Sequence, residues 1–100
     1  MAEQILDAGS AVVLTKRERI ARAELVVRRA ERAVDRAVGA YRAAETRQLA
    51  RQVSLPATSR RVTDAKARTI ALARDLAAAR DHLVTARETL AAARAPVGRS

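Results

Sequence analysis

The sequence has no cysteine, no tryptophan and no phenylalanine, and Tyr41 is its only aromatic residue. Without cysteine the chain can form neither a disulfide nor a thiolate zinc site, and it offers no thiol nucleophile. Its single histidine, His82, has no companion for a classical metal site, so we expect no metal and no cofactor. Because strands are rich in aromatic and β-branched residues, this composition favours an all-α protein.

Long apolar runs and catalytic groupings are also absent from the sequence. No apolar stretch reaches the length of a membrane span, and the first basic residue is Lys16, which argues against a secretory signal. We therefore expect no membrane contact, and a location in the cytoplasm or in a particle assembled there. The sequence contains no Gly-rich phosphate loop and no nucleophile with a partner base, so we do not expect an enzyme.

What the sequence does contain is a heptad pattern in two stretches, Ile20 to Ala44 and Thr69 to Ala93. Large side chains alternate with alanines at spacings of three and four residues, which is typical of helices that pack along a narrow seam. The predicted seam residues are Ile20, Val27, Val34, Tyr41, Leu72, Leu76, Leu83 and Leu90.

The two stretches match each other when the chain folds back at Pro56. In that register Ala30 lies opposite Leu83 and Val27 lies opposite Ala86, and almost every layer sets a large side chain against an alanine. Alternation of large and small residues lets two helices interdigitate at close approach. The pattern therefore predicts an antiparallel pair of helices.

Charged residues beside the seam agree with this register. Exposed ion pairs stabilise by only about 0.2–1 kcal/mol each, so their value is in fixing register and direction. The pairs predicted across the hairpin are Glu24–Arg87, Glu31–Arg80 and Glu45–Lys66.

We accordingly predict an all-α fold, a long antiparallel two-helix hairpin of the alanine-rich coiled-coil type over residues 15–95. Thr15 and Glu18 have the spacing of a capping box, which begins the first helix. Pro56 ends that helix, because the residue before a proline is pushed away from helical angles. The predicted segments are an acidic N-terminal arm (1–14), a helix (15–53), a tip (54–59), a second helix (60–94) and a C-terminal tail (96–100).

One seam of this kind buries few large side chains for the number of residues that it orders. We therefore expect the hairpin to be completed by oligomerisation or by docking on a larger assembly. A second apolar line on the second helix, with two apolar residues of the first helix, supplies the candidate interface. Its residues are Ile70, Ala77, Val84, Ala91, Leu25 and Val26.

The formal net charge is +9, and basic residues are concentrated near the tip. Arg60 and Arg61 stand at the start of a helix, where cations oppose the helix dipole, and a bound anion such as nucleic-acid phosphate or an acidic partner would relieve the conflict. No aromatic residue lies near the tip for base stacking, so sequence-specific recognition is not expected. The basic tip consists of Arg47, Arg51, Arg60, Arg61, Lys66 and Arg68.

These features predict a non-enzymatic structural or assembly protein whose partners are further copies of itself or other protein subunits. A minor virion or capsid-associated protein of a high-GC actinobacterial phage would fit the arginine-rich composition. One alternative is a basic module that binds nucleic acid non-specifically through the arginine-rich tip. The other alternative is a small helical adaptor or regulator.

Overall fold

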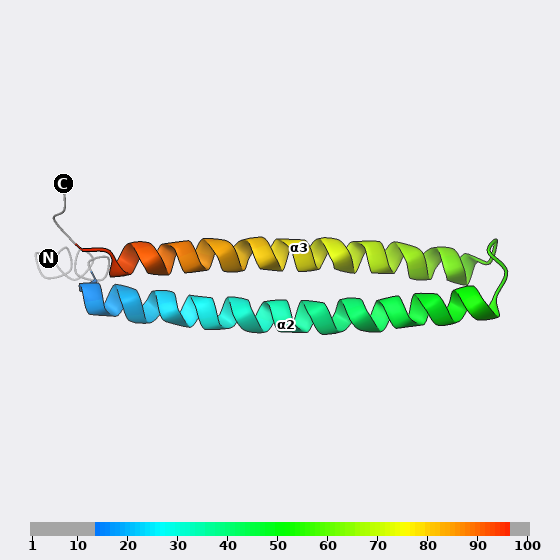
Figure 1. Cartoon of the computed structure of the whole chain (residues 1–100), viewed down its shortest axis with the longest axis horizontal. Helices are drawn as coiled ribbons and strands as arrows, with labels where there is room; N and C mark the ends of the chain where they lie inside the picture. Colours follow the sequence, from blue (N-terminus) through cyan, green and yellow to red (C-terminus); the bar gives the residue numbers. More distant parts are fainter. Residues whose placement is uncertain (1–13, 97–100) are drawn as a thin grey trace, which may run out of the picture.

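The computed structural model describes residues 14–96, which form two antiparallel helices joined by a short turn (Figure 1). Helix α2 spans Lys16–Ser54 and helix α3 spans Arg60–Arg94. The predicted all-α hairpin is confirmed, and the described residues contain no strand. Nearly all of the predicted N-terminal arm and most of the C-terminal tail, residues 1–13 and 97–100, lie outside the described residues.

Helix α2 begins at a complete capping box. The Thr15 hydroxyl accepts a hydrogen bond from the backbone N–H of Glu18, and the Glu18 carboxylate accepts one from the backbone N–H of Thr15, both at 3.1 Å. These bonds satisfy two backbone donors that a helix start leaves without partners. The backbone N–H of Thr15 and, to a smaller extent, its hydroxyl lower the pKa of the Glu18 carboxyl, because each stabilises the ionised form of that group.

The turn between the helices is extended at Leu55, whose backbone N–H donates to the carbonyl of Arg51 at 2.9 Å. Pro56 then reverses the chain, and its carbonyl accepts from the N–H of Ser59 at 2.9 Å. The Ser59 hydroxyl accepts from the N–H of Arg61 at 3.3 Å and caps α3. A proline after an extended residue and a serine cap are sufficient to end one helix and begin the next.

The seam between the helices is where the described residues bury their apolar side chains. Ala30, Leu83 and Ala86 form its central cluster, and Val27 and Val34 pack against them. Only 2% of the surface of Ala30 is exposed to solvent, because the side chains across the seam cover it. Of the eight predicted seam residues, Leu76 and Leu83 are buried and the other six are half-buried.

Thr69 is the one polar residue buried in the seam of the described chain. Its hydroxyl lies 2.9 Å from the carbonyl of Ala65, one turn back in α3, and 3.4 Å from the carbonyl of Ala44 in α2. Bonding to the preceding turn satisfies the buried hydroxyl, and the longer contact crosses the hairpin. The seam prediction omits Thr69, because a polar side chain is not expected at a core position.

The ion pairs beside the seam differ from those that the sequence predicts. Glu24 pairs with Arg94 at 2.8 Å and Glu31 pairs with Arg87 at 3.5 Å. The sequence predicts Arg87 for Glu24 and Arg80 for Glu31, which is wrong: each carboxylate meets the arginine seven residues further along α3. In every helix the side chains lean toward the N-terminus of that helix. In an antiparallel pair, the side chains of Glu31 and Arg87 therefore lean toward each other, whereas those of Glu31 and Arg80 lean apart.

The third predicted pair, Glu45 with Lys66, does not form within residues 14–96. The Glu45 carboxylate instead accepts a hydrogen bond from the Tyr41 hydroxyl, one turn earlier in α2, at 3.2 Å. The negative charge of Glu45 and this hydrogen bond raise the pKa of Tyr41 above its ordinary value. Tyr41 thus uses its ring at the seam edge and its hydroxyl in this local bond.

Candidate interaction surfaces

The seam divides the hairpin into two long faces. We call the side that carries the pairs Glu24–Arg94 and Glu31–Arg87 the charged face. We call the opposite side, on which Val26 of α2 lies near His82 of α3, the groove face.

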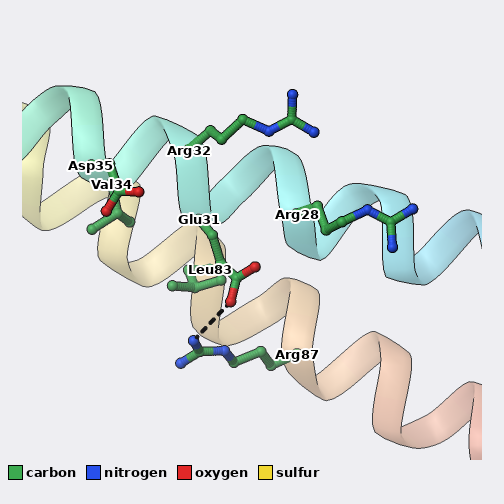
Figure 2. A pocket seen from close by; sticks show the side chains of 7 residues that line it. All are labelled: Arg28, Glu31, Arg32, Val34, Asp35, Leu83 and Arg87. Atoms are coloured by element: carbon green, nitrogen blue, oxygen red, sulfur yellow. Dashed lines mark hydrogen bonds and ion pairs between the residues drawn. The ribbon is translucent and has the colours of Figure 1, made fainter.

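On the charged face, a hollow of about 580 Å³ lies over the middle of the seam. Figure 2 shows the Glu31–Arg87 pair bridging the two helices beside Leu83, whereas Arg28 and Arg32 extend away from this pair. Its lining contains guanidinium, carboxylate and aliphatic groups but no hydroxyl, thiol, amine or imidazole. The hollow is lined by Arg28, Glu31, Arg32, Val34, Asp35, Leu83 and Arg87.

The apolar line of α3 borders the same face. Ile70 and Val84 remain 50% and 54% exposed, and Ala77 and Ala91 between and beyond them are exposed too. Ala77 lines a smaller hollow together with Val38 and Arg80, which places the line along the charged face. We call Ile70, Ala77, Val84 and Ala91 the α3 stripe.

The remaining residues of the predicted interface do not join the α3 stripe. Val26 is on the groove face, where it is 37% exposed, and Leu25 is its half-buried neighbour in α2. The structure therefore distributes the six predicted interface residues over more than one side of the hairpin. Sequence reasoning also missed Leu49 and Val53, which are 59% and 88% exposed near the tip. Their spacing of one helical turn was the available signal.

The groove face carries an apolar groove of about 570 Å³ at the end of the hairpin away from the tip. Small side chains from both helices form much of its lining, and two arginines of α2 add positive charge. Among residues 14–96, His82 lines the groove without another imidazole or any carboxylate. Its lining residues are Leu14, Arg19, Arg22, Ala23, Val26, His82, Thr85, Ala86, Thr89, Ala92 and Ala93.

At the basic tip, the hairpin brings Arg47 and Arg51 of α2 to Arg68 of α3 around a hollow of about 120 Å³. Asp64 is the one carboxylate in that lining, and it lies 4.0 Å from the guanidinium of Arg60. Both members of this pair are largely exposed, so their attraction is weak. Three guanidinium groups at one hollow are suited to hold an anion.

The other three predicted tip residues, Arg60, Arg61 and Lys66, are not part of the lining of that hollow. Arg61 is exposed in the first turn of α3, and its backbone N–H already donates to the Ser59 cap. Lys66 is exposed and lies at the heptad position that Arg80 and Arg87 occupy further along α3, which directs it to the charged face. The predicted tip therefore separates into an arginine hollow and more scattered charges.

Within residues 14–96, no three carboxylate or imidazole side chains gather closely enough to hold a metal ion. The same part of the chain contains no helix of the length and apolarity needed to cross a bilayer. Comparison with known proteins found no matching family model, no matching curated protein and no matching solved structure.

Proposed function

We propose that this protein is a structural or assembly protein, a rod that binds a further copy of itself or another protein subunit through the α3 stripe. The observation that carries the proposal is the exposure of Ile70 and Val84 on one line of α3. They are separated by about 21 Å along the helix, at ~1.5 Å per residue, with Ala77 between them. Two large apolar side chains spaced in this way are typical of a helix that packs against another helix.

The seam gives a physical reason for such an interaction. Its central cluster contains one leucine and two alanines, with two half-buried valines beside it, so the hairpin alone buries little large apolar surface. Covering the exposed halves of Ile70 and Val84 would contribute roughly 1–1.5 kcal/mol each. The alanines of the stripe would let a partner helix approach closely.

The experiment is a measurement of molar mass by light scattering across a range of protein concentrations. We expect an oligomer, or co-purification with another subunit, and we expect Ile70→Gln with Val84→Gln to lose the association while keeping helix content. The matched control is Ala71→Gln with Ala78→Gln, two exposed positions of α3 outside the stripe. A folded monomer at every concentration that also binds no subunit would refute the proposal.

The form of assembly we favour is a minor component of a virus particle, specifically a minor virion or capsid-associated protein of a high-GC actinobacterial phage. The support is the arginine-rich composition and the absence of a metal-binding cluster from residues 14–96. Proteomic analysis of purified particles would test it, because a virion component co-purifies with the particle at constant stoichiometry.

The arginine hollow favours a second candidate function, non-specific binding of nucleic acid through the tip. The observation is that Arg47, Arg51 and Arg68 line one hollow in which Asp64 is the one acidic residue. Guanidinium groups pair with phosphate oxygens in a bidentate manner. The single aromatic residue, Tyr41, does not line this hollow, so the contact would be to the backbone rather than to bases.

Titration of a labelled DNA duplex by fluorescence anisotropy at several salt concentrations tests this second function. Replacing Arg47, Arg51 and Arg68 with glutamine should weaken binding and reduce the log–log salt slope by up to ~0.9 for each lost phosphate contact. The control replaces Arg28, Arg32 and Arg36 with glutamine, which removes the same charge elsewhere. If both variants weaken DNA binding equally, net charge alone explains the effect, and a binding site at the tip is rejected.

A further inference from the structure

The apolar groove begins where the described part of the chain begins. Leu14, the first described residue, is itself part of the lining, and the groove continues along α2 as far as Val26. Its α3 side is formed by residues from His82 to Ala93. The groove is thus located at the end of the hairpin at which the chain enters α2.

The chemistry of the groove is apolar inside and basic beside it. Ala23 and Ala86 are buried at the seam and form its floor, and Val26 stands at its side. Arg19 and Arg22 contribute guanidinium groups from the first turns of α2. One nitrogen of Arg19 donates to the carbonyl of Leu14 at 2.7 Å, which holds that guanidinium at the groove entrance.

The thirteen residues that precede Leu14 have a composition complementary to this groove. They include acidic side chains, Glu3 and Asp7, and no lysine or arginine. They also include five large apolar side chains, which are Met1, Ile5, Leu6, Val12 and Val13. An acidic, apolar segment adjoining a basic, apolar groove is matched in both charge and polarity.

The segment is also long enough to reach the whole groove. From Leu14 to Val26 the groove extends about 18 Å along α2, at ~1.5 Å per residue. Residues 1–13 reach about 20 Å at that same rise, and up to ~45 Å if extended. Because the segment is tethered at the groove, its effective local concentration is on the order of millimolar, well above that of a second copy in dilute solution.

We propose that the apolar groove is a docking site for residues 1–13 of the same chain. The apolar side chains of the segment cover Ala23, Val26 and Ala86, and its carboxylates approach Arg19 and Arg22. This site is on the groove face, so it is independent of the α3 stripe and leaves that stripe free. Loss of one interaction therefore does not imply loss of the other.

The absence of cysteine from the chain permits a direct test. Gln4→Cys gives a single attachment point for a nitroxide spin label in the full-length protein, and the label broadens nearby methyl resonances in NMR spectra. We expect loss of intensity for Thr85, Thr89 and Ala92 at the groove, and intact signals for Ala43 and Ala67, exposed residues nearer the tip. Equal broadening at the groove and near the tip, or none, would overturn the proposal.

Two variants make the result specific to the groove. Val26→Glu places a carboxylate at the groove wall, where it repels an acidic segment, and it should abolish the broadening of the groove methyls. Ala21→Glu is the matched control, an equal change of charge at an exposed position of α2, and it should leave the broadening unchanged. Circular dichroism confirms that each variant keeps its helices, and persistence of the broadening in Val26→Glu would contradict the proposal.

A mixed sample identifies the chain that supplies the segment. Isotope-labelled protein without the nitroxide is combined with unlabelled protein that carries it. If residues 1–13 dock on their own chain, the groove methyls of the isotope-labelled protein keep their intensity. Broadening in the mixed sample would assign the groove to the segment of a second copy and overturn docking on the same chain.

Discussion

At the scale of single residues, the alanines of the seam set the distance between the helices. Ala30 and Ala86 are 2% and 4% exposed, and each faces a larger side chain in the opposite helix. A methyl group leaves just enough room for that side chain, so the two backbones lie close together. A larger residue at either position has no free volume to occupy.

Substitution of these alanines tests the packing. Ala30→Leu or Ala86→Leu should lower the free energy of unfolding by about 1–3 kcal/mol, because the added carbons force neighbouring side chains out of their preferred rotamers. Ala43→Leu, at an exposed position of α2, should change it little. Urea denaturation followed by circular dichroism measures all three variants, and similar midpoints would show that Ala30 and Ala86 are not in the packed seam.

At the scale of elements, both helices begin with two basic residues, Lys16 and Arg17 in α2 and Arg60 and Arg61 in α3, but they differ in the acidic residue of the first turn. Helix α2 has Glu18 in its first turn, where a carboxylate interacts favourably with the positive end of the helix dipole. Helix α3 has no acidic residue in its first turn, and Arg60 and Arg61 stand there instead. In α2 the Glu18 carboxylate partly offsets the charge of Lys16 and Arg17, whereas in α3 no carboxylate of the first turn offsets Arg60 and Arg61.

The capping box predicts a pH dependence of stability. Since folding lowers the pKa of Glu18, its carboxylate contributes stability above its unfolded-state pKa, and this contribution is lost as the pH falls through the lowered folded-state value. Glu18→Gln can still accept the Thr15 N–H bond but does not titrate. The difference in Tm between wild type and variant should therefore shrink on acidification from neutral pH. A difference that is constant with pH would contradict this role.

The start of α3 predicts a stabilising substitution. Arg61→Glu replaces a cation with an anion beside the free N–H groups, which should raise the free energy of unfolding by about 0.3–1 kcal/mol at low salt. Arg74→Glu makes the same change of charge in mid-helix and is the control. Thermal denaturation at low and high salt measures both variants. If Arg61→Glu raises stability equally at low and high salt, the helix dipole is not the cause of the increase.

The sequence was sufficient to predict the fold because heptad spacing, a capping box and a proline turn depend on local rules. The partners of Glu24 and Glu31 were not predictable from heptad positions alone, since the choice between neighbouring arginines depends on the direction in which side chains lean. The second heptad stretch begins at Thr69, but the burial of this polar side chain depends on a hydrogen bond to Ala65, which the pattern does not show. The arginine hollow needed the register of both helices, which brings Arg68 to Arg47.

At the scale of the whole molecule, the hairpin is a thin rod with little interior. Its two helices contact each other along one seam, and no third element of residues 14–96 covers either face. A protein of this shape gains stability from whatever covers its exposed apolar side chains. Its stability should accordingly depend on the concentration of its partner.

Thermal denaturation at a series of protein concentrations tests this dependence. If copies of the chain associate through the α3 stripe, Tm should rise with concentration, because mass action favours the associated folded state. The Ile70→Gln, Val84→Gln variant should melt at a lower temperature that does not change with concentration. A wild-type Tm that does not change with protein concentration would exclude self-association. The partner would then be another protein subunit.

The chain enters α2 and leaves α3 at the same end of the rod, and the turn is at the other end (Figure 1). A pulling force applied across those two neighbouring ends acts on one layer of the seam at a time, beginning with the layer nearest the ends, so the helices peel apart at low load. A force applied between the turn and the ends is carried along the helix axes by their backbone hydrogen bonds, and it does not separate the layers of the seam. The hairpin is therefore mechanically strong along its length and weak across its open end.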